Sequence, residues 1–376
     1  MRTVLFISNS ARLECARYIK GISAFAEHRP WNVQSIGGPL AKGQVARLLS
    51  FWKPAGCIVQ CGGGYDLPER LFGKTPVVYI DRSPDIAPPR CLLVTQDSRR
   101  IGEIAARELL SLDCEHYAFI DIPGSPYWSR ERRETFADAL AANGRTVSVF
   151  SGSGKGTLAT FIKGLPKPLG VFATNDAAAE PVFHACGSLG LSIPDDVAVL
   201  GVDNDEMLCE MMRPTLSTVP SNAESAGYVG AELLARKLDE PNLAGVHLTY
   251  SPGAICRRQS TMRLRRRDDR VLAALEALRK ANGNLSLDEV FALLGDSRRN
   301  AEIRFKRATG QTVLDEIHAL RITCAQALLA SQTYRIGEVA HLCGFKSEAT
   351  FRRVFSAQTG CSAREWQRRE RLAHDA

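Results

Sequence analysis

Short apolar runs alternate with amphipathic helical segments along about the first 240 residues of this 376-residue chain. Continuous apolar runs of this length are typical of strands whose two faces are both covered by helices, as in parallel sheets. The alternation therefore predicts an α/β fold, with two smaller sheets rather than one sheet of about ten strands. The predicted strands are 3–8, 33–36, 56–60, 77–80, 92–95, 117–121, 147–150, 169–173 and 197–202, and the predicted helices are 12–27, 41–51, 99–112, 130–142, 158–163, 177–189 and 223–239.

Polar motifs follow several of these strands. Ligands of such folds bind beyond the carboxyl ends of the strands, so these positions are candidates for a binding site. The motifs are Ala-Thr-Asn-Asp at 173–176, Ser-Ile-Pro-Asp-Asp-Val at 192–197, Leu-Gly-Val-Asp-Asn-Asp at 200–205, Arg-Pro-Thr-Leu-Ser-Thr-Val at 213–219 and Arg-Gln-Ser-Thr at 258–261. With Asp97, Gly102, His116, Arg132 and Phe136, their order and spacing resemble the effector-binding domain of LacI-type regulators, which is related to periplasmic sugar-binding proteins. The resemblance covers residues 3–262 and implies a sensor of two Rossmann-like lobes.

A small set of polar and aromatic residues near the strand ends is expected to contact the effector. Carboxylates and amides bind paired sugar hydroxyls, a guanidinium donates in a fixed fork, and an aromatic ring covers the apolar face of a sugar. The resemblance implies the first four of the following residues, and position and chemistry add the rest: Arg132, Asn175, Asp203 and Asp97, then Asn9, Ser10 and Trp128, with Tyr127 as the alternative to Trp128.

Four of these assignments have a structural alternative. Asn175 and Asp203 are also suited to capping the helices that follow them, since Asn and Asp accept hydrogen bonds from the first backbone N–H groups of a helix. Surface ion pairing is the alternative for Arg132, and plain packing is the alternative for Trp128.

Residues 336–355 predict a helix, a tight turn and a second helix. Gly344 suits the left-handed conformation of the turn, and Ser347 suits the cap of the second helix. This is the arrangement with which a helix-turn-helix enters a DNA major groove. Residues at helical spacing form the buried faces: Ile336, Val339 and Ala340, then Phe351, Val354 and Phe355. The candidates for contacting DNA are Lys346, Ser347, Glu348, Thr350, Arg352 and Arg353.

A first motif of the same kind is predicted upstream. Helices at 270–282, 287–294 and 298–309 surround a turn at 295–297, and a long helix at 313–330 joins the two motifs. A rigid joining helix would hold both reading helices against successive major grooves, about 34 Å apart. The candidates of the first motif for contacting DNA are Arg298, Arg299, Asn300 and Glu302.

The last hundred residues resemble the DNA-binding domain of AraC/XylS regulators. The matching residues are Phe305, Lys306, Arg307 and Gly310 in the first motif, and Gly344, Phe345, Ser347, Phe351, Arg353, Phe355, Gly360, Cys361, Ser362 and Trp366 in and after the second. The chain departs from the family at Ala363 and Trp366, where Pro and Tyr are usual, and at Ala301 and Ile303, where Leu and a DNA-contacting Arg are usual. Base reading by the first motif is therefore left open. Without the resemblance, an ordinary helical hairpin with a solvated basic face is the alternative.

Charge divides the chain in the same way as the motifs. Residues 263–376 carry 21 Lys and Arg against 14 Asp and Glu, whereas residues 1–262 carry 27 of each. An excess of positive charge is expected where a protein meets phosphates. We therefore expect a sensor at 1–262, a charged linker at 263–270 and a DNA-binding domain at 271–376. Because the first strand follows Met1 almost directly, we expect no DNA-binding headpiece before the sensor.

Several classes of function lack sequence support. The 11 Cys show no metal-ligand spacing, and we expect no metal and no cofactor. The Gly/Ser loop at 151–157 does not have the spacing of a P-loop, and no nucleophile elbow is present, so an enzyme is not expected. No apolar run reaches about 20 residues and no signal-peptide cleavage site follows the N-terminus, which favours a cytoplasmic protein.

These observations predict a one-component transcription regulator that binds double-stranded DNA and a small effector, most simply a sugar. The same pairing of domains occurs in regulators of xylose operons, which suggests a pentose such as xylose, an activating role, a homodimer and contact with RNA polymerase. Two alternatives come from other classes: a sugar-binding or sugar-modifying protein whose C-terminal helices bind a protein partner, and an architectural DNA-binding protein that needs no ligand.

Overall fold

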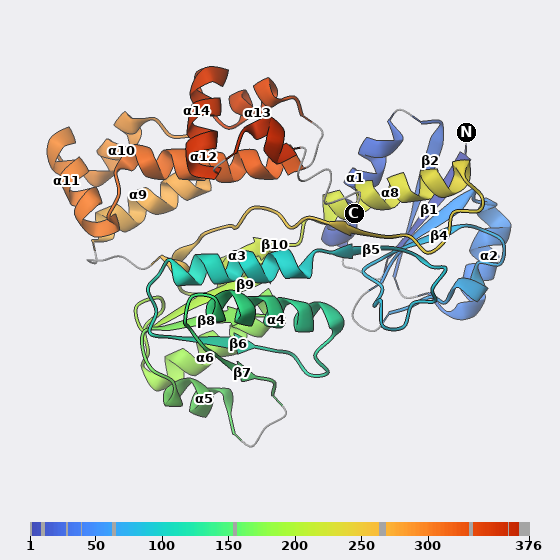
Figure 1. Cartoon of the computed structure of the whole chain (residues 1–376), viewed down its shortest axis with the longest axis horizontal. Coiled ribbons are helices and arrows are strands. Elements are labelled where there is room, and N and C mark those ends of the chain that lie inside the picture. The colour runs from blue at the N-terminus through green and yellow to red at the C-terminus, as the bar shows by residue number, and fades with distance from the viewer. Residues whose placement is uncertain are drawn as a thin grey trace.

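The computed structural model describes residues 2–8, 12–27, 29–38, 40–61, 65–152, 156–262, 268–330, 334–359 and 361–367. The chain forms two α/β lobes and a separate group of helices (Figure 1). Residues 263–267, which are most of the predicted linker, and residues 153–155 of the Gly/Ser loop lie outside the described residues. No described helix is both long enough and apolar enough to cross a membrane.

A six-stranded parallel sheet forms the centre of the first lobe, in the order β11-β5-β4-β3-β1-β2. α1 (Arg12–Ala26) and α8 (Ala223–Asp239) cover one face, and α2 (Lys42–Trp52) packs on the other. Both faces are buried, which explains the continuous apolar runs of the sequence. The strands are β1 (Arg2–Ser8), β2 (Trp31–Gly37), β3 (Gly56–Gln60), β4 (Val77–Ile80), β5 (Leu92–Gln96) and β11 (His247–Tyr250), and a 3₁₀ turn, η1 (Glu69–Leu71), follows β3.

α1 and α8 touch at the level of their backbones because each has a glycine at the crossing. A Cβ atom at Gly21 would lie 1.8 Å from the carbonyl oxygen of Glu224, and one at Gly227 would lie 2.1 Å from that of Tyr18. Any larger residue at either position would push the helices apart. The two glycines therefore hold α8, which arrives from the second lobe, firmly against the first.

The second lobe has its own five-stranded parallel sheet, in the order β10-β9-β8-β6-β7. Two sheets were predicted instead of one, and this is confirmed. The strands are β6 (His116–Ile120), β7 (Val147–Phe150), β8 (Leu169–Ala173), β9 (Val197–Asp203) and β10 (Ser217–Pro220). The helices are α3 (Ser98–Leu110), α4 (Tyr127–Ala141), α5 (Leu158–Gly164), α6 (Asp176–Leu189) and α7 (Glu206–Met211).

The chain crosses between the lobes three times. It leaves the first lobe after β5, returns after β10, and leaves again through residues 251–256, which follow β11. The last crossing ends beside β10, where Thr218 and Cys256 exchange backbone hydrogen bonds of 3.0 and 2.8 Å. A 3₁₀ turn, η2 (Gln259–Thr261), closes the second lobe.

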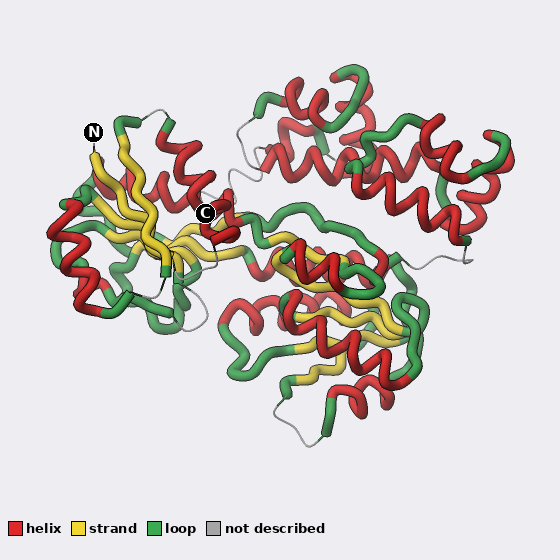
Figure 2. The backbone as a smooth tube through the Cα atoms, turned by 180° about the vertical axis from the view of Figure 1, so that it is seen from behind, coloured by secondary structure: helices red, strands yellow, loops and turns green. Residues whose placement is uncertain are grey.

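Six helices are described in the C-terminal part, and α12 is common to both halves of it. The first half of α12 packs with α9, α10 and α11 in one apolar core, and its second half packs with α13 and α14 in another. The predicted bounds of α10, α11 and α12 are confirmed. In Figure 2 this helical domain lies alongside the second lobe. The helices are α9 (Asp269–Lys280), α10 (Leu287–Leu294), α11 (Arg298–Thr309), α12 (Val313–Ala330), α13 (Ile336–Leu342) and α14 (Glu348–Thr359).

Candidate effector site and DNA-reading surface

Arg132 of α4 is buried where the two lobes meet, with 3% of its surface exposed. One terminal nitrogen donates to the carbonyl oxygen of Thr174, after β8 of the second lobe, at 2.5 Å. The other donates at 2.5 Å to the side-chain oxygen of Gln96, the last residue of β5 in the first lobe. Within the described part of the chain, its buried Nε has no hydrogen-bond partner. An unpaired buried donor is costly, so an acceptor beside this N–H would stabilise the site.

Groups from both lobes surround this guanidinium. Burial lowers the pKa of Arg132, while the nearby Asp203, Tyr250, Tyr127 and Asp81 act in the opposite direction. Asp203 and Tyr127 belong to the second lobe, and Tyr250 and Asp81 belong to the first. The site therefore combines one buried cation, two carboxylates and two phenols at the line where the lobes meet.

Trp128 lies one helical turn before Arg132, with its ring 4.6 Å from the guanidinium carbon. Packing was the alternative role for this residue, and the structure shows packing on a cation rather than on an apolar core. A half-buried ring in this position stabilises the charge of the guanidinium and adds a flat apolar surface beside it.

The helix packing that positions Arg132 depends on Gly102. A Cβ atom at Gly102 would lie 2.7 Å from the carbonyl oxygen of Arg132 and 3.0 Å from the backbone nitrogen of Phe136. Glycine therefore lets α4 approach α3 closely, and this approach places Arg132 next to Gln96, which precedes α3. The close packing of α3 on α4 therefore explains why the sequence motif combines Gly102 with Arg132 and Phe136.

Asn175 and Asp97 both cap helices. The side chain of Asn175 accepts a hydrogen bond of 2.8 Å from the backbone N–H of Ala178 in α6, and Asp97 accepts one of 2.8 Å from Arg100 in α3. Capping was the alternative to ligand binding for Asn175. Because the bond uses the amide oxygen, it is compatible with ligand binding through the amide nitrogen.

Asp203 ends β9 and does not cap the helix that follows. The cap of α7 is Asp205, which accepts from the backbone N–H of Leu208 at 3.2 Å. Asp203 has a φ of 109°, a conformation that side chains other than glycine rarely adopt, and such strain tends to occur at functional sites. Asn9 and Ser10 lie outside the described residues.

Asp81 belongs to this cluster but was not predicted. It follows β4 with a φ of 57°, and its carboxylate accepts from the hydroxyl of Tyr250 at 3.0 and 3.2 Å. It also accepts from the hydroxyl of Tyr18 at 3.4 Å and from the backbone N–H of Gln96 at 3.2 Å. The rule that ligands bind at strand ends, applied to β4, would have included it.

The second helix-turn-helix forms as predicted. α13 ends at Leu342, Gly344 has a φ of 75°, and the hydroxyl of Ser347 accepts from the backbone N–H of Thr350 at 3.2 Å. Lys346, Ser347, Glu348, Arg352 and Arg353 are exposed, and Thr350 is half-buried.

Two of these candidates also contact each other. Nε of Arg352 donates to the Glu348 carboxylate at 2.9 Å, and the two form an ion pair one helical turn apart. Such exposed pairs are weak, so DNA phosphates can compete for Arg352.

α11 is the second helix of the first helix-turn-helix, in the position from which such a motif reads DNA. Arg298, Arg299 and Asn300 are exposed at its start, and Glu302 is half-buried. The guanidinium of Arg298 lies 5.3 Å from the ring of Phe291 in α10. Ile303 is also exposed, at 49%, so this helix presents an apolar side chain among its polar ones. α11 and α14 both pack against α12, which anchors the two reading helices to one rod.

Comparisons with known proteins match both parts of the chain. Residues 94–261 match a periplasmic binding protein-like domain, and residues 292–369 match a helix-turn-helix domain. The xylose operon regulatory protein of Escherichia coli K12 is 29% identical over 321 residues, which cover 82% of this chain and 78% of that protein. The protein of the same name from Haemophilus influenzae is 26% identical over 290 residues, 74% of this chain and 75% of that protein. In both of its parts the chain is similar to AraC-type transcription regulators that carry a LacI-type sensor domain.

Solved structures agree with this fold. The structure of the xylose-binding transcription activator XylR matches 97% of this chain and 97% of its own chain, with a TM-score of 0.58 and 24% identity. A complex of the transcriptional regulator CelR with cellobiose matches 69% of this chain and 84% of its own, with a TM-score of 0.54 and 21% identity. The curated relatives are regulators, so a C-terminal domain that serves only as a protein-binding module is not favoured.

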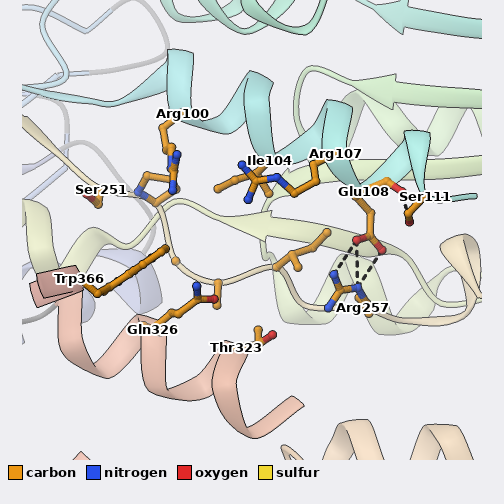
Figure 3. A pocket seen from close by; sticks show the side chains of 15 residues that line it. Arg100, Ile104, Arg107, Glu108, Ser111, Ser251, Arg257, Thr323, Gln326 and Trp366 are labelled. Carbon is orange, nitrogen blue, oxygen red and sulfur yellow. Dashed lines mark hydrogen bonds and ion pairs between the residues drawn. The ribbon is translucent and has the colours of Figure 1, made fainter. Parts of the chain in front are cut away.

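The two lobes of this regulator form its sensor, and α9–α14 form its reader. The sensor and the reader meet at α3 and α12, on either side of a cavity of about 240 Å³ (Figure 3). Sensor residues of the cavity include Arg107 and Glu108 on α3 and Arg257 after the last crossing, and Gln326 and Trp366 line its reader side. The described residues contain no cluster of three or more His, Cys, Asp or Glu that could hold a metal ion.

Proposed function

We propose that this regulator binds a sugar between the two lobes of its sensor and activates transcription of a sugar-utilisation operon. The observation that supports this most strongly is Arg132, which bonds to both lobes and keeps a buried N–H without a partner. A sugar hydroxyl supplies the missing acceptor, and Asp203, Asp81 and Trp128 supply the other contacts a pyranose needs. The names of the relatives suggest a pentose, with xylose as the first choice.

Ligand binding at this place favours closure of the lobes. The residues around Arg132 come from both lobes, so a sugar that contacts all of them binds the closed form better than the open one. The equilibrium shifts only by that difference in affinity. The three crossings transmit the movement, because the last one ends at η2 and leads into α9.

For the reader, we propose that a cytoplasmic homodimer binds operator DNA through α11 and α14 and contacts RNA polymerase. Arg353 and Arg352 on α14, with Lys346, are the main candidates for contacts in the major groove, and Arg298 and Arg299 are those of α11. No enzymatic step is part of this proposal. The sensor spans residues 1–262 and the DNA-binding domain 271–376, with residues 263–270 as the linker. Met262, the last residue of the proposed sensor, is buried in the core formed by α9–α12, so the packing of the DNA-binding domain reaches back across the proposed linker.

Isothermal titration with D-xylose, L-arabinose, D-ribose and D-glucose tests the sensor part. We expect heat and saturation with one pentose and much weaker binding of glucose. The reader is tested in parallel by gel-shift titration of DNA from upstream of the neighbouring sugar operon, with and without that pentose. Absence of heat from every sugar contradicts the sensor proposal, and equal affinity for operator and unrelated DNA contradicts the reader proposal.

A further inference from the structure

One face of α3 and one face of α12 line the cavity between the sensor and the reader (Figure 3). Residues three, four or seven positions apart lie on the same side of a helix, and the lining residues of both helices have this spacing. The lining does not include Arg132 or the groups described around it, so this cavity is separate from the site between the two lobes. Lining residues at this spacing are Arg100, Ile104 and Arg107 on α3, and Thr323, Gln326 and Ala327 on α12.

Positive charge predominates on the sensor side of this cavity. The guanidinium groups of Arg100, Arg107 and Arg257 line it together with one carboxylate, that of Glu108. Arg257 already binds Glu108 through three hydrogen bonds of 2.7–3.0 Å. The side chain of Arg107 has no hydrogen bond or ion pair within the described residues, and that of Arg100 pairs with the exposed Glu103 at 2.9 Å. Because exposed ion pairs are weak, both Arg107 and Arg100 are available to an anion.

The reader contributes neutral hydrogen-bonding groups to the opposite wall, where Figure 3 shows Gln326 and Trp366. Nε1 of Trp366 is buried and has no hydrogen-bond partner in the described part of the chain, and the side-chain amide of Gln326 has none there either. The Trp366 ring is held edge-on against Phe355, with 6.0 Å between the ring centroids. It combines a flat apolar surface with one N–H donor, and the amide of Gln326 both donates and accepts. Hydroxyl groups of a ligand would satisfy these atoms.

We propose that this cavity binds a small phosphate ester of a polyhydroxy compound, such as a phosphorylated sugar, as a second effector. Three guanidinium groups and one carboxylate leave an excess of two positive charges, which matches the charge of about −1.5 to −2 on a phosphate monoester at pH 7. Arg107 and Arg100 bind the phosphate oxygens, for which the guanidinium fork is well suited. Trp366 and Gln326 bind the hydroxyls. The volume of about 240 Å³ lies below the roughly 300–1,000 Å³ of most ligand pockets, so the ligand is small.

A ligand in this position holds the reader against the sensor. Its phosphate is bound by α3 and its hydroxyls by α12 and Trp366, so it binds the docked arrangement of the two parts better than a separated one. In Figure 1, α13 and α14 lie on the far side of α12 from α3, so the ligand does not occupy the surface proposed to read DNA. The phosphate ester therefore acts on the relative position of sensor and reader, and this inference does not depend on the sugar proposed to bind between the lobes.

Isothermal titration of the full-length regulator with D-ribose 5-phosphate, D-ribose and inorganic phosphate tests the site. We expect saturable binding of the ester and roughly tenfold or weaker binding of inorganic phosphate, which lacks the sugar hydroxyls. The same titrations with Arg132→Lys, in which the proposed sugar site is impaired, should give unchanged binding of the ester. Absence of saturable binding overturns the proposal, as does loss of ester binding in Arg132→Lys, which would place the ester between the lobes. Equal affinity for inorganic phosphate overturns the assignment to an ester.

Two variants of the cavity and one matched control complete the test. Arg107→Gln changes an exposed side chain, so it should unfold at the same urea concentration as the parent, yet bind the ester at least roughly tenfold more weakly.

Trp366→Phe keeps a ring against Phe355 but removes the N–H, and should weaken ester binding roughly three- to tenfold without changing the affinity for inorganic phosphate. Arg99→Gln, on the same helix, removes a cation that lies outside the cavity and 3.8 Å from Glu131, and should bind the ester as the parent does. Parent-like ester affinity in Arg107→Gln, or equal losses in Arg107→Gln and Arg99→Gln, overturns the proposal, and parent-like affinity in Trp366→Phe overturns the contact with the reader.

Discussion

Glu108 on α3 of the sensor is bound by Arg257, whose Nε lies 2.9 and 3.0 Å from the two carboxylate oxygens and whose Nη2 lies 2.7 Å from one of them (Figure 3). Burial lowers the pKa of Arg257, but the charges of Glu108 and of Glu316 on α12 of the reader outweigh it, so that this pKa is raised. Arg279 on α9 in turn lies 3.7 Å from Glu316. Two cations and two anions therefore lie close to one another at the contact between sensor and reader.

Replacing Glu108 tests how much this contact contributes. Glu108→Gln leaves Arg257 beside a neutral amide that can accept at only one oxygen, so a charge-assisted hydrogen bond is lost. Because Arg257 is partly exposed, we expect a loss of about 1–3 kcal/mol in the free energy of unfolding, measured by urea titration. Glu103→Gln is the matched control on the same helix. It breaks only the exposed pair with Arg100 and should cost less than about 0.5 kcal/mol.

Arg132→Lys should abolish most of the sugar affinity. Lysine cannot reach Thr174, Gln96 and a ligand atom at once, because it lacks the planar fork of donors. Loss of a hydrogen bond to a charged group corresponds to about 1.5–3 kcal/mol, or roughly a ten- to hundredfold weaker Kd by titration calorimetry. Arg130→Lys, on the same helix, changes only a surface cation paired with Asp85 and should bind sugar as the parent does. Equal affinity of the two variants would contradict the role assigned to Arg132.

Strands and helices were predictable where burial is one-sided or complete. β3 and β8 are buried along their whole length, and their sequences are apolar runs. α10 ends before Gly295, because glycine adopts a φ of 67° without strain. β10 and β11 were not predicted. Each lies at one edge of its sheet, and with four residues that include Ser, Thr and His neither forms a continuous apolar run.

The candidate site was predictable only in part, for a different reason. Arg132 and Asp203 stand in recognisable motifs. The role of Asp81, in contrast, depends on Tyr250, 169 residues later in the chain, because Asp81 accepts a hydrogen bond from the hydroxyl of that residue. No local pattern indicates a contact over that distance. The sequence also could not decide whether Asn175 caps α6, because ligand binding and capping require the same side-chain chemistry.

Arg353→Ala and Arg299→Ala test the contributions of α14 and α11 to DNA binding independently of each other. Each removes an exposed cation, and loss of a base contact should weaken operator binding by about 1–3 kcal/mol. If Arg299 contacts only phosphate, its replacement should instead weaken binding to operator and unrelated DNA alike. The slope of the logarithm of affinity against the logarithm of salt concentration should then fall by about 1. Arg90→Ala, an exposed cation of the sensor, should change neither. Fluorescence anisotropy at several salt concentrations distinguishes these outcomes, and unchanged affinity for both reader variants would contradict the assigned surface.

The buried carboxyl of Asp176 should make the stability of the protein depend on pH. Burial raises the pKa of this carboxyl to about 6, above its value of about 3.9 in an unfolded chain. The folded state therefore binds more protons between about pH 4 and 6, and its stability falls as the pH rises through that range. Urea unfolding at pH 4.5 and 7.0 should show a decrease that is smaller in Asp176→Asn. An equal decrease in both proteins would mean that Asp176 does not titrate in this range.

Gly344→Ala tests whether the turn of the second motif needs glycine. The residue has a φ of 75°, and a Cβ atom there would lie 2.2 Å from the side-chain oxygen of Asn284 and 3.4 Å from the guanidinium of Arg321. Strain and overlap together should cost about 2–4 kcal/mol in the free energy of unfolding and should also weaken DNA binding. Gly187→Ala in α6 is the matched control, because no atom lies within 4 Å of its added methyl and its helical conformation suits alanine. That substitution should raise stability by about 0.5–1 kcal/mol. If both variants unfold at the same urea concentration, the close packing of the turn against Asn284 is wrong.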